Sequence, residues 1–91
     1  MPRLEREVTI NNRLGLHARA AAKLVTEAAR FRADVKIQRG TREVSGKSIM
    51  GVMMLAAAKG TLLKLVADGD DAHAALDAVE QLIGRKFDEG E

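Results

Sequence analysis

The segment GLHARAAAKL, residues 15–24, places a histidine directly before a run of residues that favours a helix. Ala18 begins that run, so His17 occupies the N-cap, where the usual residues are Ser, Thr, Asp and Asn. A neutral imidazole caps a helix less well than those side chains, so stability alone does not account for this histidine. An imidazole here can instead accept a phosphoryl group, because unpaired backbone N–H groups and the positive end of the helix dipole stabilise an anion.

Residues next to the histidine are suited to hold such a phosphate. The backbone N–H groups of Ala18 and Arg19 lie at the expected start of the helix, and the guanidinium of Arg19 can add a charge-assisted hydrogen bond. Arg13 adds positive potential nearby. Because no substrate pocket is indicated beside this nucleophile, the pattern predicts a carrier of phosphoryl groups and not a hydrolase.

Other chemistries have little support in the sequence. The tripeptide GKS at residues 46–48 resembles the end of a P-loop, but Thr41 stands where that motif requires its first glycine. The chain has no G-x-S-x-G motif, and His17 and His73 share no metal-ligand spacing. Cysteine is absent, which excludes disulfides, zinc knuckles and thiol nucleophiles. We therefore expect no metal and no cofactor, and a phosphoryl group that is carried covalently.

Length and charge limit the function further. We expect one domain over residues 1–91, with an acidic end at residues 88–91 that is frayed. The 15 Lys and Arg residues exceed the 13 Asp and Glu residues by only two, and neither Trp nor Tyr is present for base stacking. No segment approaches the length of a membrane span. These features predict a cytoplasmic protein that binds neither nucleic acid nor membrane. The sequence does not determine the oligomeric state, for which we expect a monomer.

Periodicity predicts the elements that position His17. Apolar and polar residues alternate over residues 4–10, with Arg6 as an exception on the apolar side, and this alternation predicts a strand. Residues 18–30 have the periodicity of a helix. A hairpin of two short strands is predicted next. Val35 and Ile37 face one side of its first strand, Arg39 and Gly40 form the turn, and Val44 lies in its second strand.

The second half of the chain continues this alternation of helix and strand. A helix is predicted from Ser48, a favourable N-cap, to Gly60, which can end a helix. A strand follows at residues 62–67, and the last helix has an apolar stripe at Ala75, Leu76, Val79, Leu82 and Ile83. This order predicts an α+β fold of the βαββαβα type. We expect a two-layer open-faced sandwich, in which three helices cover one face of a four-stranded, mainly antiparallel sheet.

The predicted second helix has little polar surface for an element that covers a sheet on one side only. Exposed apolar residues there, rimmed by Arg19 and Lys47, suit a transient docking surface for acidic partners. A buried core helix that uses methionine as filler is the alternative. The residues expected to bind partners are Arg13, Lys47, Ile49, Val52 and Met53.

The motifs GLHARAAAKL and GKSIMGVMMLAAAKG, together with the element order, resemble the HPr family over nearly all of the chain. This family comprises the histidine-containing phosphocarriers of the bacterial phosphoenolpyruvate-dependent phosphotransferase system. The resemblance implies that Enzyme I phosphorylates His17 on Nδ1 and that the group passes to a histidine of an enzyme IIA-type protein. It also implies that Arg19 is the partner of that phosphate, and that Ser48 is the regulatory serine modified by HPr kinase/phosphorylase in many bacteria. Such a protein is a carrier and not an enzyme.

The sequence departs from the family pattern at three places. Ala20 stands where proline is usual, and it restores a backbone N–H group that can contact the phosphate. Leu14 replaces a polar residue common in the sugar branch and resembles the nitrogen-related branch, NPr, so both pathways stay open. The acidic tail at residues 88–91 has no assigned role.

Two other functional classes also stay open. In the first, the chain is a regulatory interaction module of the nitrogen-related branch that acts mainly through phosphorylation-dependent binding of partners. In the second, it is a small RNA-binding domain that uses the basic residues between Arg30 and Arg42. Such a domain would show association that depends steeply on salt concentration, and we expect no such dependence for this chain.

Overall fold

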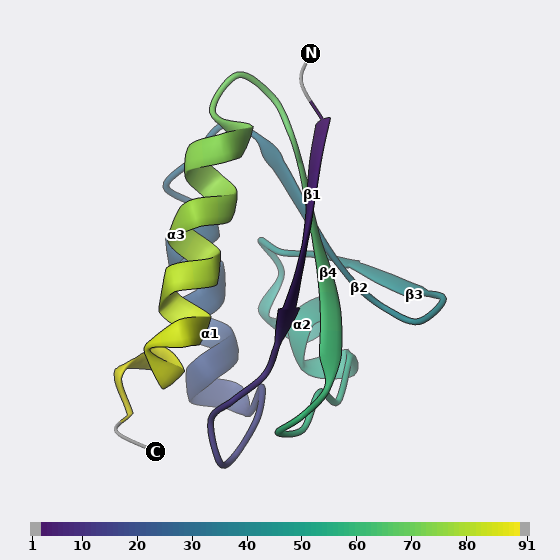
Figure 1. Ribbon diagram of the computed structural model, residues 1–91, viewed down its shortest axis with the longest axis vertical. Coiled ribbons are helices and arrows are strands. Elements are labelled where there is room, and N and C mark those ends of the chain that lie inside the picture. The colour runs from purple at the N-terminus through teal and green to yellow at the C-terminus, as the bar shows by residue number, and fades with distance from the viewer. Residues whose placement is uncertain (1–2, 90–91) are drawn as a thin grey trace.

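A single antiparallel sheet forms one layer of the molecule in the computed structural model, which describes residues 3–89 (Figure 1). Its strands lie in the order β1-β4-β2-β3. The central strand β4 pairs Leu63 with Val8 of β1 and Leu65 with Ile37 of β2. Because side chains alternate along a strand, these residues all face the same side of the sheet. The strands are β1 (Arg3–Thr9), β2 (Asp34–Arg39), β3 (Arg42–Ser45) and β4 (Leu62–Asp68).

Three helices form the second layer on that side of the sheet (Figure 1). They are α1 (Ala18–Ala28), α2 (Ile49–Met54) and α3 (Ala72–Gly84), and the short 3-10 helix η1 (Lys86–Asp88) follows α3. All five residues of the stripe predicted for the last helix are buried. The predicted fold class and element order are therefore confirmed. Among residues 3–89, no helix has the length and apolar character needed to cross a bilayer.

Arg6 interrupts the apolar face of β1 and connects it to α3. Its Nη1 lies 2.6 Å from Oδ1 of Asp77 and 2.9 Å from Oε1 of Glu80. The hydrogen bond from Arg6 holds the pKa of Asp77 below its ordinary value, against a smaller opposing effect of desolvation. The residue that breaks the strand pattern thus ties the edge of the sheet to the helix layer.

The second helix is shorter than predicted, and the expected end at Gly60 is wrong. α2 ends at Met54, and Ala56 has a φ of +50°. The carbonyl groups of Met54 and Leu55 accept hydrogen bonds from Arg42 and Arg39, at 2.6 and 2.8 Å. These arginines replace the helical donors that residues further along would have supplied, so tertiary contacts override the helix propensity of the alanines that follow.

Two other boundaries also differ from the prediction. α1 ends at Ala28, and the following residues up to Arg30 form a turn. The expected fraying of residues 88–91 does not describe Asp88, which closes η1, or Glu89, which contacts His17. Burial of Phe87, whose side chain is fully enclosed, holds this part of the tail against the core. Residues 90–91 lie outside the described residues.

Candidate functional site

His17 is the N-cap of α1, as predicted, and its backbone is extended with φ −71° and ψ 177°. The imidazole makes no capping hydrogen bond. The first helical bond of α1 runs from the N–H of Ala21 to the carbonyl of His17, at 2.8 Å. The N–H groups of Ala18, Arg19 and Ala20 precede that bond, so they are the unpaired donors that every helix start leaves.

A tight loop fixes the direction in which the chain reaches His17. Gly15 has a φ of +67°, and an added Cβ there would lie 2.4 Å from the carbonyl oxygen of Ala57. The next residue, Leu16, donates its N–H to that oxygen at 2.9 Å. The side chain of Asn12 donates to the carbonyl of Gly15 at 2.8 Å. The segment after α2 therefore holds the loop and sets the position of the histidine.

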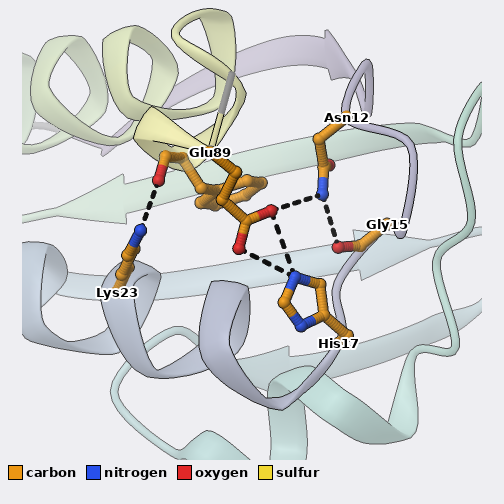
Figure 2. Close-up of polar contacts among 6 residues, drawn as sticks. Asn12, Gly15, His17, Lys23 and Glu89 are labelled. Carbon is orange, nitrogen blue, oxygen red and sulfur yellow. Dashed lines mark hydrogen bonds and ion pairs between the residues drawn. The ribbon is translucent and has the colours of Figure 1, made fainter. Parts of the chain in front are cut away.

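The imidazole of His17 has two different environments at its two nitrogens (Figure 2). Nε2 lies 2.9 Å from Oε2 and 3.1 Å from Oε1 of Glu89. Asn12 supports the same carboxylate, with Nδ2 at 3.4 Å from Oε1. By contrast, Nδ1 makes no hydrogen bond with any residue between 3 and 89, and the side chain of His17 is 27% exposed. Glu89 therefore holds Nε2 of the ring, while Nδ1 is accessible.

A shallow depression lies next to this ring. It has a volume of about 470 Å³, and it is lined by Leu14, His17, Ala18, Arg19 and Glu89. Arg19 is exposed and has neither a hydrogen bond nor an ion pair with another of the described residues, so its guanidinium is available. Within residues 3–89, no group of three or more His, Cys, Asp and Glu side chains is placed to hold a metal ion. The site is suited to an anion at the start of α1.

Ser48 is the N-cap of α2, as predicted. Its Oγ accepts a hydrogen bond from the N–H of Gly51 at 3.1 Å, and the residue is exposed. Ile49 and Met53 are also exposed, at 44% and 42% of their surface. The predicted apolar surface on α2 is therefore present.

The other residues expected to bind partners divide between the surface and the core. Arg13 and Lys47 are exposed, and the ammonium group of Lys47 donates to the carbonyl of Phe31 at 2.7 Å. Val52 was expected to contact partners, and that expectation is wrong because its side chain is fully buried. It lies on the side of α2 that packs into the core, so it can act on a partner only by supporting its exposed neighbours.

Asn12 and Glu89 belong to the site, although no motif in the sequence places them there. Asn12 is fully buried beside the loop, and Glu89 lies 72 positions from His17 along the chain. The consecutive positive φ angles that bring Glu89 back to His17 occur at Lys86, Phe87 and Asp88, none of which is glycine. Because these residue types rarely take that conformation, no turn signal marks the return of the tail.

The comparisons with known proteins agree with this architecture. A family model described as "PTS HPr component phosphorylation site" matches residues 4–85. Phosphocarrier protein HPr of Pseudomonas aeruginosa is 54% identical over the full length of both chains. Phosphocarrier protein NPr of Shewanella violacea is 48% identical, over 98% of each chain. The crystal structure of HPr from Thermoanaerobacter tengcongensis has a TM-score of 0.91 at 41% identity, and the match covers 94% of this chain and 97% of that one.

The fold and these relatives define a phosphocarrier of the phosphotransferase system, whose partners are other proteins of that system. The chain belongs to the HPr family. Its relatives include both HPr and NPr proteins, so family membership does not separate the sugar branch from the nitrogen-related branch. A second structure from Thermoanaerobacter tengcongensis is an HPr dimer, and the expectation of a monomer for this chain stays a prediction.

Proposed function

We propose that this protein carries a phosphoryl group on Nδ1 of His17, takes it from Enzyme I and passes it to a histidine of an enzyme IIA-type protein in the cytoplasm. The main support is the position of His17, whose exposed Nδ1 lies at a helix start that no side chain caps. The phosphoryl group comes originally from phosphoenolpyruvate. Membership of the HPr family supports the same role.

The transfer is a substitution at phosphorus. The lone pair of Nδ1 forms a bond to phosphorus, while the bond between phosphorus and the donor breaks and its electron pair leaves with the donor. The group brings a charge of about −1.5 to −2, which the N–H groups of Ala18 and Arg19 and the dipole of α1 stabilise. The guanidinium of Arg19 is free to pair with the phosphoryl oxygens, and Ala20 offers a further N–H group.

A shallow and open site suits a carrier, because both donor and acceptor must reach the same nitrogen. We propose that Ile49 and Met53 provide apolar contacts for these partners, and that Arg13 and Lys47 attract acidic groups on them. Charged contacts at an exposed surface mainly increase the rate of association and add little to the lifetime of the complex. Contacts of this kind therefore suit complexes that form quickly and are short-lived. The carrier then exchanges partners after each transfer.

Phosphorylation of Ser48 would regulate this docking. Ser48 is exposed at the start of α2, where the first helical turn tolerates an anion, so the fold would persist. The added negative charge would lie next to Ile49 and would repel acidic partners. We therefore propose Ser48 as a regulatory site, and HPr kinase/phosphorylase as the enzyme that modifies it in hosts that have this kinase.

The central proposal is tested by incubation of the protein with phosphoenolpyruvate, magnesium and cognate Enzyme I. We expect an adduct that acid hydrolyses and base preserves, detected by the mass of the intact protein. His17→Ala should abolish the adduct, whereas His73→Ala, which removes the other histidine, should retain it. An adduct that persists in His17→Ala, or that is absent from the natural protein, would contradict the assignment.

The recipient of the group identifies the pathway. The phosphorylated protein is mixed with a panel of cognate IIA proteins from the sugar and nitrogen-related branches, and the label on each is followed with time. Fast transfer to one of them identifies the branch. If no Enzyme I labels the protein, the result favours a regulatory interaction module over a phosphoryl carrier.

The regulatory role of Ser48 is tested with Ser48→Asp in the same assay. Aspartate is also a good N-cap, so the variant adds charge without removing the capping interaction. We expect the KM for Enzyme I to rise several-fold while kcat changes little. Thr41→Asp, which places the same charge on the exposed turn between β2 and β3, is the matched control and should leave the KM unchanged. Equal effects of the two variants would argue against regulation at Ser48.

A further inference from the structure

The tail of the chain folds back onto the site through a left-handed turn. Lys86, Phe87 and Asp88 have φ angles of 56°, 56° and 60°, a conformation that residues other than glycine rarely adopt. The turn persists because the side chain of Phe87 is fully buried. Lys23 of α1 donates to the carbonyl of Phe87 at 2.6 Å (Figure 2). The core and α1 thus fix the residue that follows this turn.

That residue is Glu89, and its carboxylate lies at the edge of the His17 ring. Oε2 and Oε1 are 2.9 and 3.1 Å from Nε2, and the side chain of Glu89 is only 14% exposed. The hydrogen bond with His17 holds the pKa of Glu89 below its ordinary value, against a smaller opposing effect of desolvation, and Lys23 and Asn12 lower the pKa further by lesser amounts. The carboxylate is therefore ionised at neutral pH.

An ionised carboxylate accepts hydrogen bonds and cannot donate them. In the neutral imidazole, which is the nucleophilic form, the close contact then requires that Nε2 carries the single ring proton, and this leaves the lone pair on Nδ1. A hydrogen bond at one ring nitrogen fixes the tautomer and orientation of a histidine in this manner in other sites. The nitrogen with the free lone pair is the accessible one at the start of α1.

We propose that Glu89 is a positioning residue for phosphoryl transfer: it keeps Nδ1 of His17 as the nucleophile and compensates the charge that the ring acquires. This inference rests on the proposed function of His17. When Nδ1 forms its bond to phosphorus, the proton stays on Nε2 and the ring becomes a cation. The carboxylate of Glu89 neutralises that cation. When the group leaves for an acceptor, the electron pair of the nitrogen–phosphorus bond returns to Nδ1, and the pair with Glu89 is restored.

The same contact excludes the wrong product. Nε2 carries a proton and faces a negative charge, so it cannot attack an incoming phosphoryl group, which is itself anionic. The structure thus accounts for selectivity between the two nitrogens of one ring. Without Glu89, both nitrogens of His17 would be open to the donor.

Three variants of the full-length protein distinguish the hydrogen bond that positions the His17 ring from the negative charge of residue 89. Glu89→Ala removes the carboxylate, and Glu89→Gln keeps an oxygen acceptor but removes the charge. Asp88→Asn is the matched control, because the neighbouring carboxylate contacts Arg85 and not His17. Each protein is measured by ¹⁵N-resolved NMR of the imidazole and by the rate of phosphorylation with Enzyme I.

We expect a slowly exchanging Nε2–H proton in the natural protein and in Asp88→Asn, and its loss in Glu89→Ala. The rate of phosphorylation at saturating Enzyme I should fall about fivefold in Glu89→Ala, as expected for a partly exposed charged pair. Glu89→Gln should keep the proton signal while losing rate. Phosphorylation of Nε2, seen in the ¹⁵N spectrum, should appear only when residue 89 cannot accept this hydrogen bond.

Two outcomes overturn the inference and differ from a failure of the proposed function. If Glu89→Ala keeps both the Nε2–H signal and the rate of the natural protein, Glu89 has no positioning role. If Asp88→Asn loses rate as Glu89→Ala does, the tail acts through its total charge and not through this contact. Should the natural protein accept no phosphoryl group at all, the proposed function fails, and the NMR signal alone decides whether Glu89 holds the ring.

Discussion

The starts of α1 and α2 are built in opposite ways. Ser48 closes the start of α2 with its own hydroxyl group, which accepts the N–H of Gly51. His17 leaves the start of α1 open, because its ring is turned to Glu89 and makes no capping bond. At α2 a side chain of the protein satisfies one of the unpaired N–H groups that begin a helix, whereas at α1 no side chain caps these groups and they are left for an outside anion.

This difference shows why the fold stays stable although the start of α1 is left uncapped. α1 does not depend on its cap, since its buried residues Ala20, Ala21, Leu24 and Ala28 anchor it in the core. α2 has six residues and buries only Val52, so local capping matters more to it. The longer, better packed helix can therefore leave its first turn to a ligand.

A substitution in the loop before α1 should have the largest effect on stability, because this loop positions the open helix start. We expect Gly15→Ala to lower the free energy of unfolding by about 3 kcal/mol or more, because it combines backbone strain with a collision. The added Cβ would lie 2.4 Å from the oxygen of Ala57 and 2.9 Å from Cα of Ala58, and backbone atoms cannot move aside cheaply. Urea denaturation followed by circular dichroism measures the change.

Substitutions at two other glycines distinguish the effect of backbone strain from the effect of a steric collision. Gly40 has a φ of +60° with nothing within 4 Å of an added Cβ, so Gly40→Ala should cost about 1 kcal/mol, from strain alone. Gly84 has neither a positive φ nor a close neighbour, and Gly84→Ala should be neutral or stabilise α3 by up to about 1 kcal/mol. If Gly15→Ala cost no more than Gly40→Ala, contact with Ala57 would not be what fixes the start of α1.

The sequence was sufficient for the elements whose signals are local. The alternation in residues 4–10, the stripe of α3 and both N-caps were read from neighbouring residues, and the structure confirms each of them. His17 stood out because its type is unusual at an N-cap. Arg6 looked like a defect in the strand pattern, since its partners on α3 are more than 70 positions away.

The errors occurred where distant contacts override local preference. The alanines after Met54 favour a helix, but Arg39, Arg42 and the loop at Leu16 take the backbone groups that a longer helix would use. The acidic end at residues 88–91 is expected to be frayed, but Asp88 and Glu89 are held against the rest of the chain. The path of Asp88 and Glu89 depends on Phe87 and Lys23, and no periodicity in the tail itself encodes those contacts.

Alanine at each N-cap gives the smallest expected effect and the sharpest test of the comparison. Ser48→Ala should lower the free energy of unfolding by about 1 kcal/mol, because the N–H of Gly51 loses its acceptor. His17→Ala is compared with the natural residue in a Glu89→Ala background, which leaves out the contact between His17 and Glu89, and there it should change the free energy of unfolding by no more than about 0.5 kcal/mol, since no capping bond is lost. Urea denaturation of both variants under identical conditions measures the two changes. Equal losses would mean that His17 stabilises the start of α1 after all, and the contrast between a closed and an open helix start would no longer hold.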